Sequence, residues 1–262
     1  MKTLLEKIRD INHIVQDATG HSISFTEMAE TLQENLEANV YILNSEGKIL
    51  GNCFIDNFDC PTMKDIVKFE GLYPGPQNED LLKINEPQVN IIREGICVFC
   101  ERTCQPQNKY TTVIPILGGG ERLGTLMLSK SEEFDDSDLV LAEVSATVIG
   151  MELLKAKVEE VEAGARQRSV VSIAFDTLSF SELEAVEHIF EELGGSEGLL
   201  VASKVADKVG ITRSVIVNAL RKLESAGLIE VRSLGMKGTY IRVLNDYVMV
   251  KLDRMKSSHH KD

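Results

Sequence analysis

Polar and basic side chains gather between residues 213 and 222, off the apolar stripe of a predicted helix. The hydrogen-bonding residues are Arg213, Ser214, Asn218, Arg221 and Lys222. The apolar stripe consists of Ile216, Ala219, Leu220 and Leu223. In complexes with DNA, polar and basic side chains such as these contact phosphate oxygens and base edges. The stretch is therefore a candidate recognition helix.

The elements around this helix follow the order of a winged helix-turn-helix. Valines at every fourth position from 201 to 209 predict a short preceding helix, which Gly210 ends. Thr212 is the expected N-cap of the recognition helix. Two β-like runs, Leu228–Arg232 and Thr239–Val243, predict a hairpin wing. Helix, turn, helix and hairpin in this order are typical of a winged helix-turn-helix domain.

The charge of this region is opposite in sign to that of the whole chain. Residues 200–245 contain eight Lys and Arg and three Asp and Glu residues, a net charge of +5, whereas the chain carries −13. A basic region in an acidic protein indicates a phosphate-binding surface. The alternative is a winged helix that contacts only proteins. The expected contacts to double-stranded DNA are Ser203, Lys204, Thr212, Arg213, Ser214, Asn218, Arg221, Lys222 and Lys237.

Length and composition are typical of a two-domain protein. The chain has 262 residues, of which 43% are hydrophobic, enough for two cores. Because the N-terminus is charged throughout, we expect no signal peptide. The sequence contains no run of 18 apolar residues, so we expect no membrane span. We therefore expect a cytoplasmic protein whose five cysteines are reduced. No nucleophile–base pair or pair of carboxylates has a catalytic spacing, so we do not expect the protein to be an enzyme. The alternative is an enzyme with a regulatory winged helix.

The chain before residue 137 mixes helical and strand patterns. Helices are predicted over residues 4–15 and 24–37, a short helix or lid over Cys60–Glu70, and a loop over Leu72–Pro87. The predicted strands are Val40–Asn44, 49–51, Ile91–Phe99 (a strand or a pair of strands), Tyr110–Leu117 and Arg122–Leu128. An antiparallel sheet of about five strands with flanking helices and covering loops is typical of small-molecule sensors of the GAF or PAS type, which periodicity does not separate.

A long helical pattern begins at Asp138 and continues through residues 155–168, which are mostly charged or small, as in an exposed connecting helix. Ser179 and Glu182 form a capping box that begins the next helix. The predicted fold class is α+β, with an N-terminal antiparallel sheet flanked by helices, a long linker helix and a C-terminal winged helix-turn-helix. The predicted limits are 1–137 for the sensing domain, 138–178 for the linker helix and 179–262 for the DNA-binding domain.

Three cysteines have a spacing that suits metal or redox chemistry. Cys97, Cys100 and Cys104 lie in the same loop-rich region as Cys53 and Cys60. Neither a second CxxC nor a nearby His completes a zinc site, so we expect no metal. A winged-helix redox or metal sensor remains the alternative function.

One glycine-rich motif imitates part of a phosphate-binding loop. Gly119, Gly124 and Thr125 have the spacing of such a loop, but no Lys precedes Thr125. The motif also joins two predicted strands instead of a strand and a helix. We therefore interpret it as a hairpin turn.

Three segments closely resemble one protein family. They are Gly118–Ser129 (GGGERLGTLMLS), Phe180–Leu193 (FSELEAVEHIFEEL) and Gly198–Tyr240, which contains ITRSVIVNALRKLESAG and RSLGMKGTYI. The chain resembles the CodY family, the global transcriptional repressors of low-GC Gram-positive bacteria. The resemblance extends over essentially the whole chain and is weakest between Cys53 and Lys109.

The resemblance implies a sensing domain of the GAF type and a regulatory function. Members of the family bind isoleucine, valine or leucine in this domain and GTP as a second effector; no other cofactor is implied. They bind operator DNA as homodimers, with a tetramer as an alternative, and repress when nutrients are plentiful. The implied targets are genes of amino-acid metabolism, stationary phase and virulence.

The resemblance also implies effector-binding residues. The implied amino-acid site is Thr62, Met63, Ile66, Tyr73, Pro74, Cys97, Val98 and Phe99. Relatives have Arg at the position of Thr62, so Lys64, Arg93 or backbone N–H groups are the candidates to hold the ligand carboxylate. The alternative is that these are ordinary core residues. The implied GTP site is Lys48, Glu152 and Lys157, where Ser45 and Glu46 replace arginines of some relatives.

Overall fold

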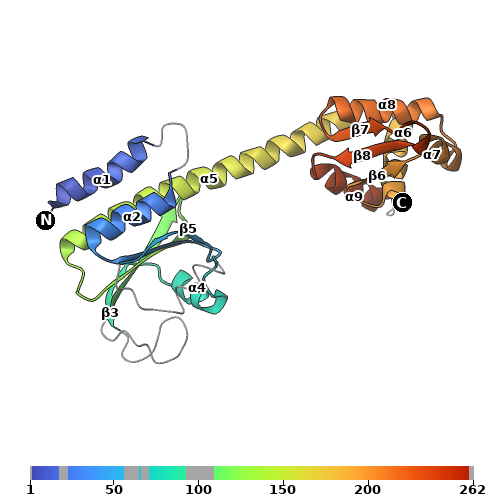
Figure 1. Ribbon diagram of the computed structural model, residues 1–262. Helices are drawn as coiled ribbons and strands as arrows, with labels where there is room; N and C mark the ends of the chain where they lie inside the picture. The colour runs from blue at the N-terminus through green and yellow to red at the C-terminus, as the bar shows by residue number, and fades with distance from the viewer. Residues whose placement is uncertain (1, 18–22, 56–64, 66–70, 93–108, 260–262) are drawn as a thin grey trace. The chain divides into compact units, whose positions relative to one another are not determined.

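The protein consists of two compact units, residues 1–158 and 159–262 (Figure 1). The computed structural model describes residues 2–17, 23–55, 65, 71–92 and 109–259. The 41-residue helix α5 (Asp136–Asp176) begins in the first unit and ends in the second. Its start agrees with the helical pattern predicted from Asp138, and Asp135 caps it by accepting a hydrogen bond from Asp138 N–H at 2.9 Å.

The first unit is built on a five-stranded antiparallel sheet with strand order β2-β1-β5-β4-β3. The strands are β1 (Asn39–Asn44), β2 (Ile49–Cys53), β3 (Gln88–Ile92), β4 (Tyr110–Gly118) and β5 (Glu121–Lys130). The predicted antiparallel sheet is confirmed. β3 begins three residues before the predicted Ile91, and residues 93–99 of that prediction lie outside the described residues.

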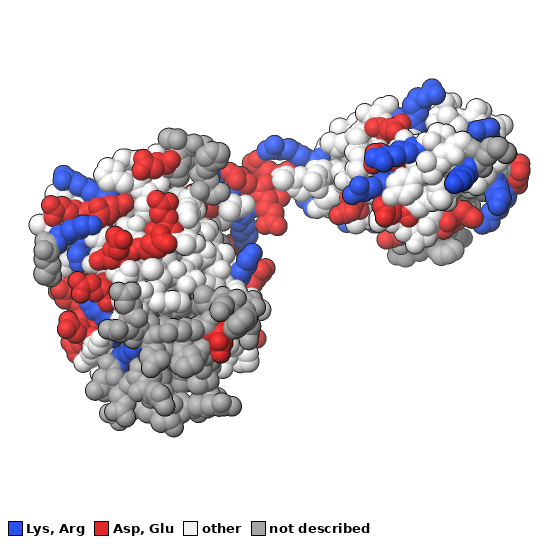
Figure 2. Space-filling view, viewed as in Figure 1, with Lys and Arg blue, Asp and Glu red and all other residues white. Residues whose placement is uncertain are grey.

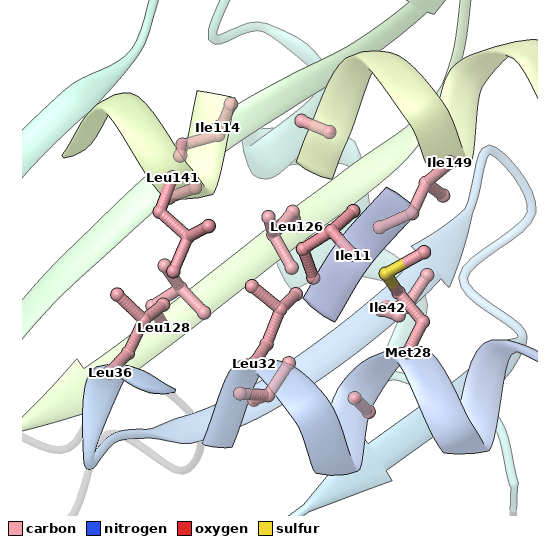
Figure 3. Packing of buried hydrophobic residues seen from close by; sticks show 14 of the residues in the cluster. Ile11, Met28, Leu32, Leu36, Ile42, Ile114, Leu126, Leu128, Leu141 and Ile149 are labelled. Atoms are coloured by element: carbon pink, nitrogen blue, oxygen red, sulfur yellow. The ribbon is translucent and has the colours of Figure 1, made fainter. Parts of the chain in front are cut away.

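Three helices cover one face of this sheet. They are α1 (Leu4–Asp17), α2 (Phe25–Leu36) and the first part of α5. Figure 3 shows their buried side chains meeting those of the strands, among them Ile11, Met28, Leu32, Leu36, Ile42, Ile114, Leu126, Leu128, Leu141 and Ile149. Each such side chain contributes about 1.5–3 kcal/mol on burial. This core holds the N-terminal half of α5 against the sheet.

The opposite face of the sheet carries a second, smaller core and helix α4 (Gly75–Leu82) (Figure 1). The buried members of this core are Tyr41, Leu43, Tyr73, Leu81, Val113 and Met127. The prediction that Leu72–Pro87 is entirely loop is wrong. Pro74 is the N-cap of α4 and Pro76 lies in its first turn, where the missing backbone N–H groups would have no helical partner. Prolines at these positions begin a helix instead of preventing one.

The second unit is a winged helix-turn-helix. Its elements are α6 (Phe180–Leu193), β6 (Glu197–Leu200), α7 (Ala202–Val209), α8 (Arg213–Ser225), β7 (Ile229–Ser233), β8 (Thr239–Val243) and α9 (Tyr247–His259). The sheet has the order β6-β8-β7. The capping box of Ser179 and Glu182, the two helices and the hairpin are confirmed. β6 and α9 are additions that periodicity did not predict.

Candidate effector pocket and nucleic-acid interface

The exposed face of α8 presents hydrogen-bond donors in a row. Its buried residues Ile216, Ala219, Leu220 and Leu223 form the predicted stripe. On the opposite face Ser214, Asn218 and Arg221 are exposed, with spacings of four and three residues. Val217, 38% exposed, lies on the same face and was missed by sequence reasoning. The row can therefore combine hydrogen bonds to phosphates or bases with an apolar contact to a thymine methyl group.

The N-terminus of α8 has no side-chain cap. Thr212 occupies the predicted N-cap position, but its hydroxyl lies 2.8 Å from the Ser214 hydroxyl and accepts no backbone N–H. The first N–H groups of the helix and its dipole therefore stay available to an anion. The exposed side chain of Arg213 lies beside them. A phosphate at this position would meet backbone donors and a guanidinium together.

Lys222, by contrast, has partners inside its own unit. Its Nζ donates to Glu182 Oε2 at 2.7 Å and to the backbone carbonyl of Thr177 at 2.9 Å. The hydrogen bond from Lys222 and the one from Ser179 N–H lower the pKa of the Glu182 carboxyl. Lys222 thus ties the C-terminal half of α8 to the beginning of α6.

The remaining predicted DNA contacts lie on α7 and in the wing. Ser203 and Lys204 are exposed on α7, and Lys237 is exposed in the turn between β7 and β8. Gly238 fixes this turn: its φ is +109°, and an added Cβ would lie 2.6 Å from the Leu200 carbonyl oxygen. The wing is therefore held against the end of β6. Figure 2 shows Lys and Arg side chains spread over the visible face of this unit.

The end of α5 is fastened to the segment that follows β8. Asn245 Nδ2 donates to the Gln167 carbonyl at 3.2 Å. The guanidinium of Arg168 stacks on the ring of Tyr247 at 5.3 Å, and an added Cβ at Gly164 would lie 3.3 Å from the Tyr247 hydroxyl. Sequence reasoning missed these residues, and the mid-helix glycine was the one available signal. Residues 164–168 of α5 thus pack within the winged-helix unit.

The smaller core contains one residue of the predicted amino-acid site, Tyr73. Tyr73 is buried there, and its backbone N–H donates to the Gly47 carbonyl at 2.7 Å. Pro74 follows as the N-cap of α4. The other predicted site residues, Thr62, Met63, Ile66, Cys97, Val98 and Phe99, and the candidate cations Lys64 and Arg93 lie outside the described residues. The buried residues of this core are apolar and aromatic.

Arg122 lies on the same face and is a residue that sequence reasoning missed. Its Nε donates to the Gly124 carbonyl at 2.6 Å, and one terminal nitrogen donates to Thr125 Oγ1 at 3.0 Å and to the Leu81 carbonyl at 3.3 Å. The other terminal nitrogen donates to the Ile84 carbonyl. Burial lowers the pKa of the guanidinium. The side chain therefore joins β5 to the C-terminal end of α4.

The glycine-rich motif beside Arg122 is a hairpin turn, as predicted. Gly119 and Gly120 have φ values of +61° and +81°, the left-handed conformation that tight hairpin turns require. Gly124 is needed for a different reason, because an added Cβ would lie 2.1 Å from the Leu43 carbonyl oxygen. The motif thus packs strands together and makes no phosphate cradle.

The three predicted GTP residues all lie in the first unit. Lys48 is exposed beside the β1–β2 turn. The Glu152 carboxylate is buried and accepts the Ile23 N–H at 3.2 Å, and Lys157 forms an ion pair with Glu121. Glu152 and Lys157 therefore have protein partners in this structure, which a nucleotide would have to share or replace.

Of the five cysteines, Cys53 lies in the described part of the chain, half-buried, and burial raises the pKa of its thiol. Cys60, Cys97, Cys100 and Cys104 lie outside the described residues, so the metal or redox alternative stays a prediction. Within the described ranges no group of three or more His, Cys, Asp or Glu side chains could hold a metal ion. No helix in those ranges is both long and apolar enough to cross a membrane.

Comparison with known proteins gives the family. Residues 3–177 match the CodY GAF-like domain and residues 196–256 the CodY helix-turn-helix domain. Proteins of Clostridium kluyveri and Clostridium perfringens, both named global transcriptional regulator CodY, are each 53% identical over 258 residues, 98% of this chain and 100% of the relative. The cofactor-binding GAF domain of the nutrient sensor CodY from Clostridium difficile is 39% identical; it covers 58% of this chain and 99% of its own, with a TM-score of 0.44. The protein therefore belongs to the CodY family of transcriptional regulators.

Proposed function

We propose that the protein is a DNA-binding global regulator, mainly a repressor, that responds to isoleucine, valine or leucine and to GTP. The observation that carries the proposal is the exposed row of donors on α8, in a basic region that shares its chain with a GAF-like domain. In this proposal residues 1–137 sense the effector, residues 138–178 form the linker helix between the two domains, and residues 179–262 bind operator DNA. The protein acts in the cytoplasm as a homodimer or tetramer. The regulated genes are those of amino-acid metabolism, stationary phase and virulence.

The DNA contacts divide by the chemistry of their positions. The row on α8 is placed to enter the major groove, since the second helix of this motif reads base edges there. The uncapped N-terminus of α8, with Arg213, and the wing lysine Lys237 are placed to bind phosphates. Lys222 contributes through the position of α8, because its ammonium is bound to Glu182. The proposed direct contacts are Ser203, Lys204, Thr212, Arg213, Ser214, Asn218, Arg221 and Lys237.

The apolar face of the GAF-like domain supports a branched aliphatic ligand. Tyr41, Leu43, Val113 and Met127 are buried together with Tyr73 in the core of this face. Burial of a branched side chain supplies about 1.5–3 kcal/mol, which is too little for useful affinity by itself. Donors must therefore bind the α-carboxylate, and acceptors must bind the α-ammonium group. Thr62, Lys64, Arg93 and backbone N–H groups near Val98 are the proposed donors to the carboxylate.

GTP is proposed as the second effector, and Lys48, Glu152 and Lys157 are its proposed binding residues. Because Glu152 and Lys157 already have protein partners, we expect GTP binding to be weaker than amino-acid binding.

The proposed function is tested by titration calorimetry of the full-length protein with isoleucine, valine, leucine and GTP, with D-isoleucine and ATP as matched controls. Saturable heat with the L-amino acids and none with D-isoleucine supports the proposed amino-acid site. No heat with any branched-chain amino acid refutes it, and zinc or oxidant titrations then test the cysteine alternative.

A further inference from the structure

The segment from residue 71 to 84 is held by the β1–β2 turn and by the beginning of β5. At its beginning, Tyr73 N–H donates to Gly47 of the β1–β2 turn, and the buried Asn78 donates from Nδ2 to the Ser45 carbonyl at 3.1 Å. At its end, Arg122 binds the carbonyls of Leu81 and Ile84. The position of α4 is therefore fixed relative to β5 by the guanidinium of Arg122.

Arg122 suits this role because of its geometry. The guanidinium is planar and carries five N–H donors, and four of its hydrogen bonds go to three backbone carbonyls and one hydroxyl. Among the described residues it has no carboxylate partner, so its charge faces the carbonyl end of α4, where a cation is favourable. A lysine ammonium is a single point of donation and cannot span these four acceptors.

The same hairpin, β4–β5, packs directly against α5. Gly150 of α5 lies so close to β4 that an added Cβ would be 2.4 Å from the Leu117 carbonyl oxygen. An added Cβ at Gly118 would in turn lie 3.0 Å from the Gly150 carbonyl oxygen. Glu121, the neighbour of Arg122, forms an ion pair with Lys157 of α5. The backbones of hairpin and helix are thus in contact with no side chain between them.

We propose that the β4–β5 hairpin couples the position of α4 to that of α5, and that Arg122 is the positioning residue of this coupling. The inference rests on the proposed function, since it takes the effector to bind beside Tyr73, at the beginning of α4. An effector that shifts α4 then shifts the hairpin through Arg122. The hairpin shifts α5 through the contact at Gly150, because close-packed backbone cannot absorb the movement. Arg122 itself does not touch the effector.

The test compares DNA binding by the full-length protein with and without saturating isoleucine. The ratio of the two dissociation constants is the coupling factor. Arg122→Met removes the four hydrogen bonds, Arg122→Lys keeps only the charge, and Gly150→Ala separates α5 from β4. The controls are Lys83→Met, which removes an exposed cation at the same end of α4, and Met151→Ala, which changes an exposed neighbour of Gly150.

We expect the coupling factor to fall by about fivefold or more in Arg122→Met and Gly150→Ala, and by less in Arg122→Lys. DNA affinity without isoleucine should stay within about twofold of the wild type in all variants, since none touches the winged helix. A coupling factor that stays within about twofold of the wild-type value in either Arg122→Met or Gly150→Ala overturns the proposal.

A second measurement decides the role of Arg122 without any ligand. Hydrogen exchange of residues 75–84 should accelerate about tenfold or more in Arg122→Met, and not in Lys83→Met, because α4 loses its attachment to β5. Equal exchange in the two variants overturns the attachment. If the wild type does not respond to isoleucine, the proposed function fails, and this exchange result still decides whether Arg122 positions α4.

Discussion

Lys222 Nζ on α8 lies 2.7 Å from Glu182 Oε2 on α6, whereas the preceding residue, Arg221, has no ion pair among the described residues. Two adjacent basic residues of the recognition helix therefore have different roles. Lys222 fixes the helix to its domain, and Arg221 is exposed on the face that carries Ser214 and Asn218. Sequence position alone gives both the same role, because both lie off the apolar stripe.

The pair gives a matched mutational test. Arg221→Ala should weaken specific DNA binding by about 1–3 kcal/mol, the range of one good contact to a base, with unfolding unchanged. Lys222→Ala should instead lower the free energy of unfolding of the winged helix, by about 1 kcal/mol or less because the pair is partly exposed. Fluorescence anisotropy and denaturant titration separate the two effects. The assignment is wrong if Lys222→Ala weakens DNA binding as much as Arg221→Ala at unchanged stability.

The lowered pKa of Glu182 predicts a dependence on pH. A carboxyl whose pKa is lower in the folded than in the unfolded state contributes stability above its unfolded pKa, near 4.5, and loses that contribution as the pH falls through its folded pKa. Glu182→Gln keeps the capping hydrogen bonds and removes the charge. The wild type should therefore be more stable than this variant at pH 7, and the difference should disappear in acid. A difference that is independent of pH would show that the charge of Glu182 contributes nothing.

The N-terminus of α8 predicts a loss of operator binding. Arg213→Ala and Ser214→Ala should each abolish specific binding in a gel shift while isoleucine binding and the folded structure persist. Both residues lie at the end of the helix where base and phosphate contacts concentrate. Unchanged affinity in both variants would refute the assignment of α8 as the recognition helix.

Lys237 should act through the phosphate backbone. Lys237→Ala is expected to weaken binding to every duplex by a similar factor and to reduce the slope of log K against log salt by about one unit. Affinities for an operator and for an unrelated duplex at four salt concentrations give this slope. A change confined to sequence preference, with the slope intact, would show that the wing reads bases.

The amino-acid site predicts an order of effects. Thr62→Ala should cost about 0.5–1.5 kcal/mol of isoleucine affinity, the contribution of one hydrogen bond. Met63→Ala and Phe99→Ala should each cost more, because they remove apolar contact with the branched side chain. Thr62→Arg should raise affinity by adding a cation near the carboxylate. Calorimetry on the four variants checks the order, and an equal loss in Thr62→Ala and Met63→Ala would contradict it.

Local patterns predicted most of the fold. The stripe of Ile216 and Leu220, the capping box at Ser179 and the glycine turn at Gly119 each concern neighbours along the chain, so their signals are in the sequence. The four-residue strand β6 was missed because it is too short to show a period, and α9 because its pattern is weakly amphipathic. Helix α4 was not predicted because a stretch rich in Pro, Gly and Asn is typical of a loop.

The candidate sites were predictable only in part. Exposure on α8 follows from helical period, and so most of its donors could be named in advance. Arg122 and Asn245 could not be named, because their partners are distant in sequence. Arg122 binds the carbonyl of Leu81, 41 residues away, and Asn245 binds the carbonyl of Gln167, 78 residues away. The partner of Lys222 was equally hidden, since Glu182 lies 40 residues away. Contacts between segments this distant depend on the tertiary structure and leave no periodic trace.

In the proposed function, one chain senses a branched-chain amino acid and changes its DNA binding in response. The decisive measurement is the affinity of the full-length protein for a duplex selected from random sequences, with and without millimolar isoleucine. We predict that isoleucine tightens binding by about 5–150-fold, the usual range of coupling between two sites, and that D-isoleucine has no effect. Equal affinity with and without isoleucine, for a protein that binds the duplex specifically, would contradict the account.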